Sequence, residues 1–244
     1  MFKALSLSLL ATLLATSSGS AQEVTQAARE EMITAIEGHA RSAPGALEDG
    51  TIDTAVLDAM RQVPRDAFVP DDVRPLAYED TPLPIGYSQT ISQPFIVALM
   101  TDLLDVGPGD TVLEIGTGSG YQAAVLSPLV DRVYSIEIVP ELGERAAGTL
   151  KEQGFDNVDT RVADGYYGWA EAAPFDGIVV TAAAGQIPPP LVEQLEPGGR
   201  MVIPIGTPFS AQMLMLIEKQ EDGSITTRQV LPVQFVPFTG AGGG

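Results

Sequence analysis

The sequence lacks cysteine and is poor in basic residues, and both features limit what the protein can be. Without cysteine the chain forms no disulfide and accepts no lipid at a leader-cleavage cysteine. Lysine and arginine number 13 against 32 aspartate and glutamate residues, which makes the net charge −19. Such a charge repels phosphate backbones and anionic lipid surfaces. We therefore expect no nucleic-acid partner, and we predict no metal site.

Long hydrophobic runs are also missing. The apolar stretch at residues 4–14 is too short to span a membrane as a helix. It follows Lys3 and precedes small residues that end at Ala21, a pattern typical of a secretory signal peptide cleaved before Gln22. We predict export to the periplasm or the exterior, with no stable membrane association after cleavage. An uncleaved membrane anchor and a cytoplasmic location are the alternatives.

The length of 244 residues and the 45% hydrophobic content suit one packed domain after the leader. We divide the mature chain into N-terminal helices with a substrate loop (residues 22–94), a core (residues 95–238) and a disordered tail (residues 239–244). We expect a monomer.

Helical spacing of apolar residues predicts a first helix over residues 24–39 and a second helix after a cap at Thr51 or Asp53. Residues 63–94 are rich in proline, which favours an extended loop over a helix. Such a loop can close over a site.

Alternating and continuous apolar stretches then predict β-strands, with helices between the earlier ones. The predicted strands cover residues 111–115, 132–137, 159–162, 177–181, 201–205, 213–218 and 225–233. This order indicates a doubly wound, mostly parallel, seven-stranded α/β sheet of Rossmann-like type. The last two strands have no helix between them, so we expect an antiparallel hairpin at one edge.

A glycine-rich loop follows the first predicted strand of that sheet. Gly116, Gly118 and Gly120 allow the backbone to approach a ligand closely before a helix begins near Tyr121. A dinucleotide-binding fingerprint would place its last glycine at position 121, where this chain has tyrosine. The spacing therefore disfavours NAD.

Acidic residues stand at the ends of the next two predicted strands. Glu137 can accept both hydroxyls of a ribose, and Asp164 can accept from an adenine amino group. A helix cap or a solvated loop end is the alternative for each. Together with the glycine loop they indicate S-adenosylmethionine bound to a class I methyltransferase fold. The predicted cofactor-binding residues are Glu114, Gly116, Thr117, Gly118, Gly120, Glu137, Asp164 and Gly165.

A polar segment precedes a predicted helix that starts at or just after Gln93. Ser92 lies at the helix cap or beside it. One interpretation is that Ser92 only caps the helix. The other is that free helix N–H groups and the hydroxyls of Ser92 and Thr90 bind a substrate carboxylate. The candidate substrate-binding residues are Thr90, Ile91, Ser92 and Thr181, and spacing alone leaves both interpretations of Ser92 open.

Four stretches in this order resemble the protein-L-isoaspartate O-methyltransferase family: VPRDAFVP, AYEDTPLPIGYSQTISQP, VLEIGTGSGYQAAVL and DGYYGW. The resemblance covers residues 52–238. It implies methyl transfer from S-adenosylmethionine to the free carboxylate of isoaspartyl residues in damaged proteins, which starts their repair. It also implies that Ser92 is the active-site serine, Glu137 the ribose acid and Asp164 the adenine-side acid.

By the same resemblance, the stretch LPVQFVPF helps to hold the substrate peptide. The chain departs from the family at Ser88, where glycine is usual, and at Asp66, where histidine is frequent. A carboxylate is already the nucleophile near neutral pH, so no base is required, and His39 is interpreted as a surface or helix residue rather than a catalyst. An exported small-molecule O-methyltransferase and a cofactor-binding module without catalysis remain the alternatives.

Overall fold

The structure is a computed structural model that describes residues 25–43, 45–47, 49–207 and 211–241. The predicted signal peptide, residues 1–21, lies outside these ranges. Across the described ranges, no helix combines the length and the apolar character needed to cross a membrane.

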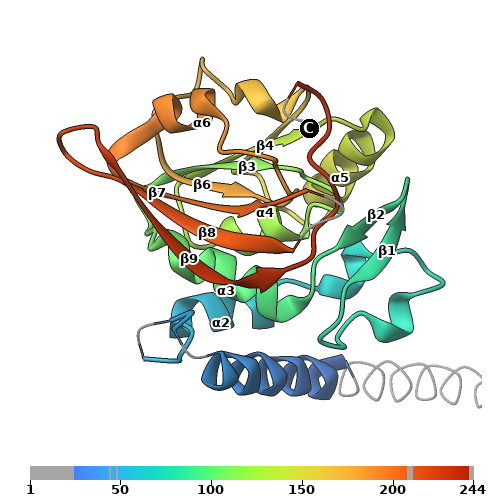
Figure 1. Ribbon diagram of the computed structural model, residues 1–244. Helices are drawn as coiled ribbons and strands as arrows, with labels where there is room; N and C mark the ends of the chain where they lie inside the picture. Colours follow the sequence, from blue (N-terminus) through green and yellow to red (C-terminus); the bar gives the residue numbers. More distant parts are fainter. Residues whose placement is uncertain (1–24, 44, 48, 208–210, 242–244) are drawn as a thin grey trace, which may run out of the picture.

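A seven-stranded sheet forms the centre of the molecule (Figure 1). The strand order is β5-β4-β3-β6-β7-β8-β9; the first five of these strands run parallel, and β8 is antiparallel to both of its neighbours. The bounds are β3 (Thr111–Ile115), β4 (Arg132–Glu137), β5 (Val158–Val162), β6 (Phe175–Val180), β7 (Leu195–Ile205), β8 (Gln212–Lys219) and β9 (Ile225–Val233). The fold class, the seven predicted strands and the antiparallel edge hairpin are confirmed.

Helices cover both faces of this sheet. Successive residues of a strand point to opposite sides, so each buried strand presents apolar side chains to both layers of helices. In β3, Val112 packs in one apolar cluster with the N-terminal helices, whereas Leu113 and Ile115 pack in the other. The helices are residues 25–42, α2 (Thr54–Gln62), α3 (Pro94–Leu104), α4 (Tyr121–Leu126), α5 (Pro140–Glu152) and α6 (Pro189–Gln194).

The two N-terminal helices are confirmed. The first helix, residues 25–42, buries Met32, Ile33 and Ile36 at helical spacing. The second, α2, starts after Asp53, whose side chain accepts a hydrogen bond from the Ala55 N–H at 2.6 Å. The cap is thus Asp53 rather than Thr51.

The prediction of one extended loop over residues 63–94 is wrong in its detail. The segment contains two 3₁₀ helices, η1 (Arg65–Phe68) and η2 (Arg74–Leu76), and a hairpin of β1 (Leu83–Gly86) and β2 (Gln89–Ile91). The hairpin lies beside α5 in Figure 1, and Arg145 of α5 donates to the Ile85 carbonyl at 2.5 Å. Elements of three or four residues are too short to produce an apolar period, so the sequence pattern missed them.

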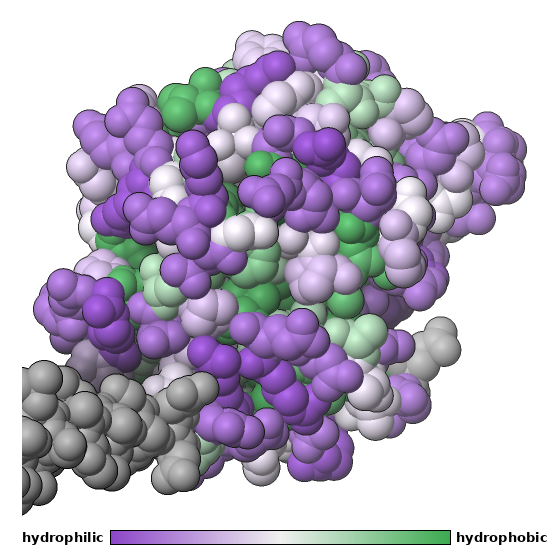
Figure 2. Space-filling view, turned by 180° about the vertical axis from the view of Figure 1, so that it is seen from behind, coloured by the Kyte–Doolittle hydropathy of each residue, from purple (hydrophilic) through white to green (hydrophobic). Residues whose placement is uncertain are grey.

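Figure 2 shows one face that is mostly hydrophilic, with apolar residues visible in small separate areas. Most apolar side chains are instead packed in the two clusters on either side of the sheet.

Candidate active site

The glycine loop joins β3 to α4 at the carboxyl end of the sheet, where ligands bind in open α/β folds. The backbone N–H groups of Gly116 and Thr117 donate to the Ile136 carbonyl of the neighbouring strand, at 2.8 and 3.2 Å. Gly116 has φ 97°, and a side chain there would collide with the Thr181 hydroxyl, which donates to the Gly116 carbonyl at 2.7 Å. Glycine is therefore required at position 116 by both conformation and space.

Glu137 ends β4 directly beside this loop. Its two carboxylate oxygens accept from the backbone N–H groups of Gly118, at 2.7 Å, and Val139, at 2.9 Å. The residue is 5% exposed and lines a cleft of about 580 Å³ together with Gly116, Gly118 and Gly165. Each carboxylate oxygen can accept more than one hydrogen bond, so this fixed carboxylate can still accept ligand hydroxyls from the cleft.

Glu114 at the end of β3 and Thr117 of the loop do not line the 580 Å³ cleft. Burial raises the pKa of Glu114 to about 8, although a hydrogen bond from the Ser135 hydroxyl opposes this shift. The Thr117 hydroxyl bonds the same serine at 2.6 Å. At neutral pH Glu114 is therefore mainly protonated. The hydrogen bonds that join Glu114, Ser135 and Thr117 connect the loop to β3 and β4. Both residues border a smaller hollow of about 320 Å³.

Asp164 and Gly120 each stand at the start of a helix. Asp164 caps the short 3₁₀ helix η3 (Gly165–Tyr167), since its Oδ1 accepts from the Tyr166 N–H at 3.0 Å. Its Oδ2 accepts from the Ala241 N–H at 2.8 Å, so both oxygens are engaged and the cleft wall is formed by Gly165. Gly120, with φ 89°, is the N-cap of α4 and faces Leu150 of α5.

Residues 90–92, called the Ser92 segment below, form the other side of the site. Thr90 belongs to β2 and Ser92 follows two residues later, so both point to one face while Ile91 between them is buried. Ser92 lines a hollow of about 1010 Å³ together with Thr90, Thr181 and the segment 232–236. Within the described chain, no group bonds the hydroxyl of Thr90 or Ser92, which leaves both hydroxyls available to a ligand.

Helix α3 begins at Pro94 as predicted, but its N-cap is Gln93 and no side-chain bond from the cap residue is formed. Asp80 takes that role from a distance, because its Oδ1 accepts from the Phe95 N–H at 2.8 Å. The N–H groups of Ile96 and Val97 donate to the Gln93 carbonyl. The predicted contribution of free helix N–H groups to a carboxylate site is therefore wrong, and the interpretation of Ser92 as a simple cap is not supported.

Two threonines connect the hollows. Thr90 and Thr181 line the 580 Å³ cleft, the 1010 Å³ hollow and the 320 Å³ hollow. A ligand in the cleft and a second ligand beside Ser92 would therefore meet at these residues. The structure thus brings the predicted cofactor side and the predicted substrate side into contact.

The stretch LPVQFVPF, residues 231–238, and Thr239 after it also line the site. Val236, Pro237, Phe238 and Thr239 form part of the cleft wall, held there by the Phe238 N–H donating to the Ala183 carbonyl at 2.8 Å. The prediction of a disordered tail is wrong for residues 239–241, because Thr239 lines the cleft and the Ala241 N–H donates to Asp164. Residues 242–244 are outside the described ranges. The resemblance assigned residues 231–238 to substrate contact, and the sequence analysis did not single out Thr239 or the contact of this stretch with the cofactor cleft.

His39 lies outside the three hollows and is half-exposed, and its Nδ1 bonds Asp80 Oδ2 at 2.5 Å. In the part of the chain that the structure describes, no group of three or more histidine or acidic residues could hold a metal ion.

Comparison with known proteins agrees with this geometry. The family model "Protein-L-isoaspartate(D-aspartate) O-methyltransferase (PCMT)" matches residues 47–243. Protein-L-isoaspartate O-methyltransferase 2 of Syntrophobacter fumaroxidans is 60% identical over 222 residues, covering 91% of this chain and 90% of the relative. Protein-L-isoaspartate O-methyltransferase 1 of Cupriavidus necator is 58% identical over 212 residues, covering 87% and 82%.

Solved structures show the same architecture. A protein-L-isoaspartate O-methyltransferase superposes with a TM-score of 0.78 at 28% identity, covering 88% of this chain and 67% of its own. A Plasmodium falciparum protein, described as a putative enzyme of this kind in complex with S-adenosyl-L-homocysteine, shares the fold with a TM-score of 0.69 at 24% identity. The chain belongs to the protein-L-isoaspartate(D-aspartate) O-methyltransferase family.

Proposed function

We propose that Ser92 and Thr90 present the carboxylate of an isoaspartyl residue to a methyl donor bound in the neighbouring cleft. The chain is an S-adenosylmethionine-dependent protein-L-isoaspartate O-methyltransferase, and the methyl ester that it forms initiates repair of the damaged protein. The observation that carries the site assignment is that Thr90 and Thr181 line both the cleft and the hollow that contains Ser92.

The residues of the cleft suit an adenosyl ligand. Its carboxylate, Glu137, is held by two backbone amides at the end of β4 and matches a ribose diol. The backbone of Gly116 and Gly118 leaves room for the ligand to approach closely. Gly165 and Phe238 line the same cleft and would contact the adenine base. When bound, S-adenosylmethionine supplies a methyl group attached to a positively charged sulfur.

The chain's own task in the reaction is placement. An isoaspartyl carboxylate is ionised at neutral pH, so no residue has to remove a proton. The hydroxyls of Thr90 and Ser92 donate hydrogen bonds to its oxygens and set their direction. Holding two reactants in line corresponds to effective molarities on the order of 10⁵–10⁸ M. Ile91 and Phe238, both nearly buried beside the hollows, limit the entry of water.

The direct test compares acceptors that differ in one backbone connection. We expect methylation of an isoaspartyl peptide and none of its aspartyl twin, measured by transfer of a labelled methyl group. Methylation of small carboxylic acids but not of the isoaspartyl peptide would support a small-molecule O-methyltransferase. Binding of S-adenosylhomocysteine without transfer to any acceptor would support a cofactor-binding module.

We also propose that residues 1–21 direct the enzyme to the periplasm or the exterior, where it acts as a monomer without stable membrane association. The support is the order Lys3, apolar stretch and small residues in the sequence. Mass spectrometry of the mature N-terminus in separated cell fractions tests this, with Gln22 as the expected first residue. An intact Met1 in the cytoplasmic fraction would contradict it, and light scattering of the mature chain tests the monomer.

A further inference from the structure

Arg65 is a fully buried charged residue that the proposed reaction leaves unexplained. It begins η1, in the segment that precedes the β1–β2 hairpin, and its side chain is 0% exposed. Charged residues are almost never fully buried unless their charge has partners. The partners of Arg65 therefore indicate what the residue does.

The hydrogen-bond partners of Arg65 are backbone carbonyls. Its Nε donates to the Ala77 carbonyl at 2.8 Å, and its Nη2 donates to the carbonyls of Ser92, at 2.7 Å, and Thr81, at 3.5 Å. These three carbonyls come from separate points of the segment that leads to Ser92. One planar group holds them together with donors on separate nitrogens in a fixed geometry, whereas lysine has all three of its donors on one nitrogen at the end of a flexible chain.

The guanidinium also contacts the residue that follows the glycine loop. Arg65 Cζ lies 4.8 Å from the ring centroid of Tyr121, the first residue of α4 and the residue that follows the glycine loop. Burial lowers the pKa of Arg65 to about 10, so the group is charged at neutral pH and the contact is a cation–π interaction. One side chain thus touches both the Ser92 backbone and the helix after the glycine loop.

We propose that Arg65 is a positioning residue that sets the location of Ser92 relative to the glycine loop, and hence of the acceptor carboxylate relative to the methyl donor. This inference rests on the proposed function. The residue touches no reacting atom and acts through the Ser92 backbone. Small displacements matter here because a 1 Å error in placement can lower a rate by about 100-fold.

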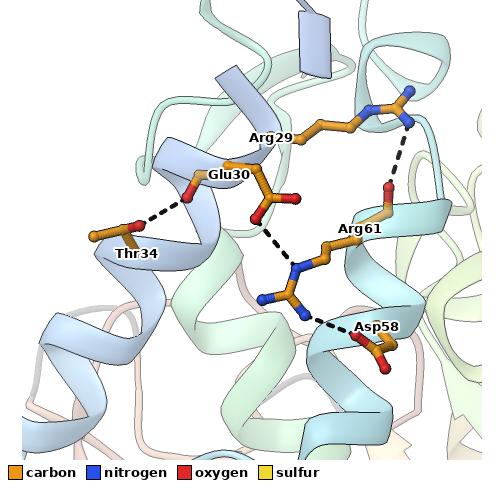
Figure 3. A network of polar contacts seen from close by, with 5 residues as sticks. All are labelled: Arg29, Glu30, Thr34, Asp58 and Arg61. Atoms are coloured by element: carbon orange, nitrogen blue, oxygen red, sulfur yellow. Dashed lines mark hydrogen bonds and ion pairs between the residues drawn. The ribbon is translucent and has the colours of Figure 1, made fainter. Parts of the chain in front are cut away.

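The chain offers a matched control at Arg29. This arginine of the first helix donates to the Tyr78 hydroxyl at 2.9 Å and to the Arg61 carbonyl at 3.3 Å, and it also lies over a tyrosine ring. Figure 3 shows that it belongs to a network joining the first helix to α2. Arg29→Lys therefore repeats the chemistry of Arg65→Lys at a place that contacts neither Ser92 nor Tyr121.

The experiment measures kcat on an isoaspartyl peptide and the Kd of S-adenosylhomocysteine for Arg65→Lys, Arg65→Met and Arg29→Lys. We expect both Arg65 variants to lower kcat by about 10- to 100-fold. We expect the Kd to change by less than about twofold, because the loop itself is held by β4. We expect Arg29→Lys to keep the kcat of the unaltered protein. In a Ser92→Ala background, Arg65→Lys should lower kcat much less, because Arg65 acts through Ser92.

Several outcomes would overturn the positioning role. Full kcat in Arg65→Lys would do so, and so would an equal loss of kcat and cofactor affinity accompanied by a lower melting temperature. Failure of both Arg65 variants to fold would assign the residue to the fold instead. If the unaltered protein does not methylate the isoaspartyl peptide, the proposed function itself fails, and this inference fails with it.

Discussion

The glycine loop and the Ser92 segment line neighbouring hollows that share Thr90 and Thr181, yet different kinds of contact hold the two. The loop is held by its neighbour in the sheet, through backbone bonds to Ile136 and the Glu137 carboxylate. The Ser92 segment lies outside the large sheet. Its first residues pair with β1, and beyond them buried side chains hold it, Arg65 on the Ser92 carbonyl and Asp80 on the Phe95 N–H. A loop at a strand end inherits its geometry from the sheet, whereas a segment outside it needs polar side chains from elsewhere in the chain.

The largest expected effect is on the cofactor half, at Glu137. Glu137→Gln replaces one acceptor oxygen by a donor that faces a backbone N–H, and it weakens the contact to ligand hydroxyls. We expect S-adenosylhomocysteine to bind about 100-fold more weakly, or about 2.7 kcal/mol. Titration calorimetry checks this, with the exposed Glu141→Gln in the first turn of α5 as the control. Affinity within about threefold of the unaltered protein would contradict the role.

The next effect is on the substrate half, at Ser92. Ser92→Ala removes a hydroxyl that makes no bond to the described chain, so stability should barely change. We expect kcat on an isoaspartyl peptide to fall by about 10- to 100-fold while cofactor affinity stays the same. Steady-state kinetics measures kcat, and titration with S-adenosylhomocysteine measures cofactor affinity. The control is Ser42→Ala, which changes an exposed serine of the first helix. Unchanged turnover in Ser92→Ala would remove the residue from catalysis.

A third effect is a dependence of stability on pH that arises beneath the glycine loop. The pKa of Glu114 is about 8 in the folded chain, against about 4.3 unfolded, so the folded state binds more protons between these values. This contribution to stability is fully present below pH 4.3 and is lost as the pH rises to 8.

We expect the unaltered protein to lose up to about 1.4 kcal/mol of unfolding free energy per pH unit in that range, relative to Glu114→Gln. Urea unfolding of both proteins at several pH values measures the difference. A constant difference from pH 5 to pH 8 would show that Glu114 does not titrate there.

The smallest effect concerns the β1–β2 turn, where Ser88 departs from the family's usual glycine. Its φ is 57°, a conformation that costs a residue with a side chain about 1–2 kcal/mol. Part of the gain is offset by the greater freedom of glycine when unfolded, so Ser88→Gly should stabilise the protein by about 0.5–1 kcal/mol. Ser224→Gly, in the β8–β9 turn, is the control and should destabilise, since Ser224 bonds Asp222. Urea unfolding decides, and a destabilised Ser88→Gly would refute the strain argument.

The other departure from the family pattern has a structural partner. Asp66 accepts from the Tyr78 hydroxyl at 2.5 Å, and Arg29 donates to the same hydroxyl. The position thus supports the contact of the first helix with the segment before the active site. The family model begins at residue 47, after the first helix, although that helix buries Met32, Ile33 and Ile36 in the same core.

The sequence by itself determined the strands of the seven-stranded sheet, the glycine loop, the start of α3 and the presence of Glu137 beside the loop. Each of these depends on neighbours a few residues away, or on the regular alternation of strands and helices, and both leave a period in the sequence. Only the tertiary structure decided that Asp80 rather than Ser92 caps α3, that Asp164 bonds Ala241, and that Arg65 lies between Ser92 and Tyr121. These contacts join residues that are distant along the chain, and a buried polar side chain finds its partners through the packing of the whole domain rather than through local spacing.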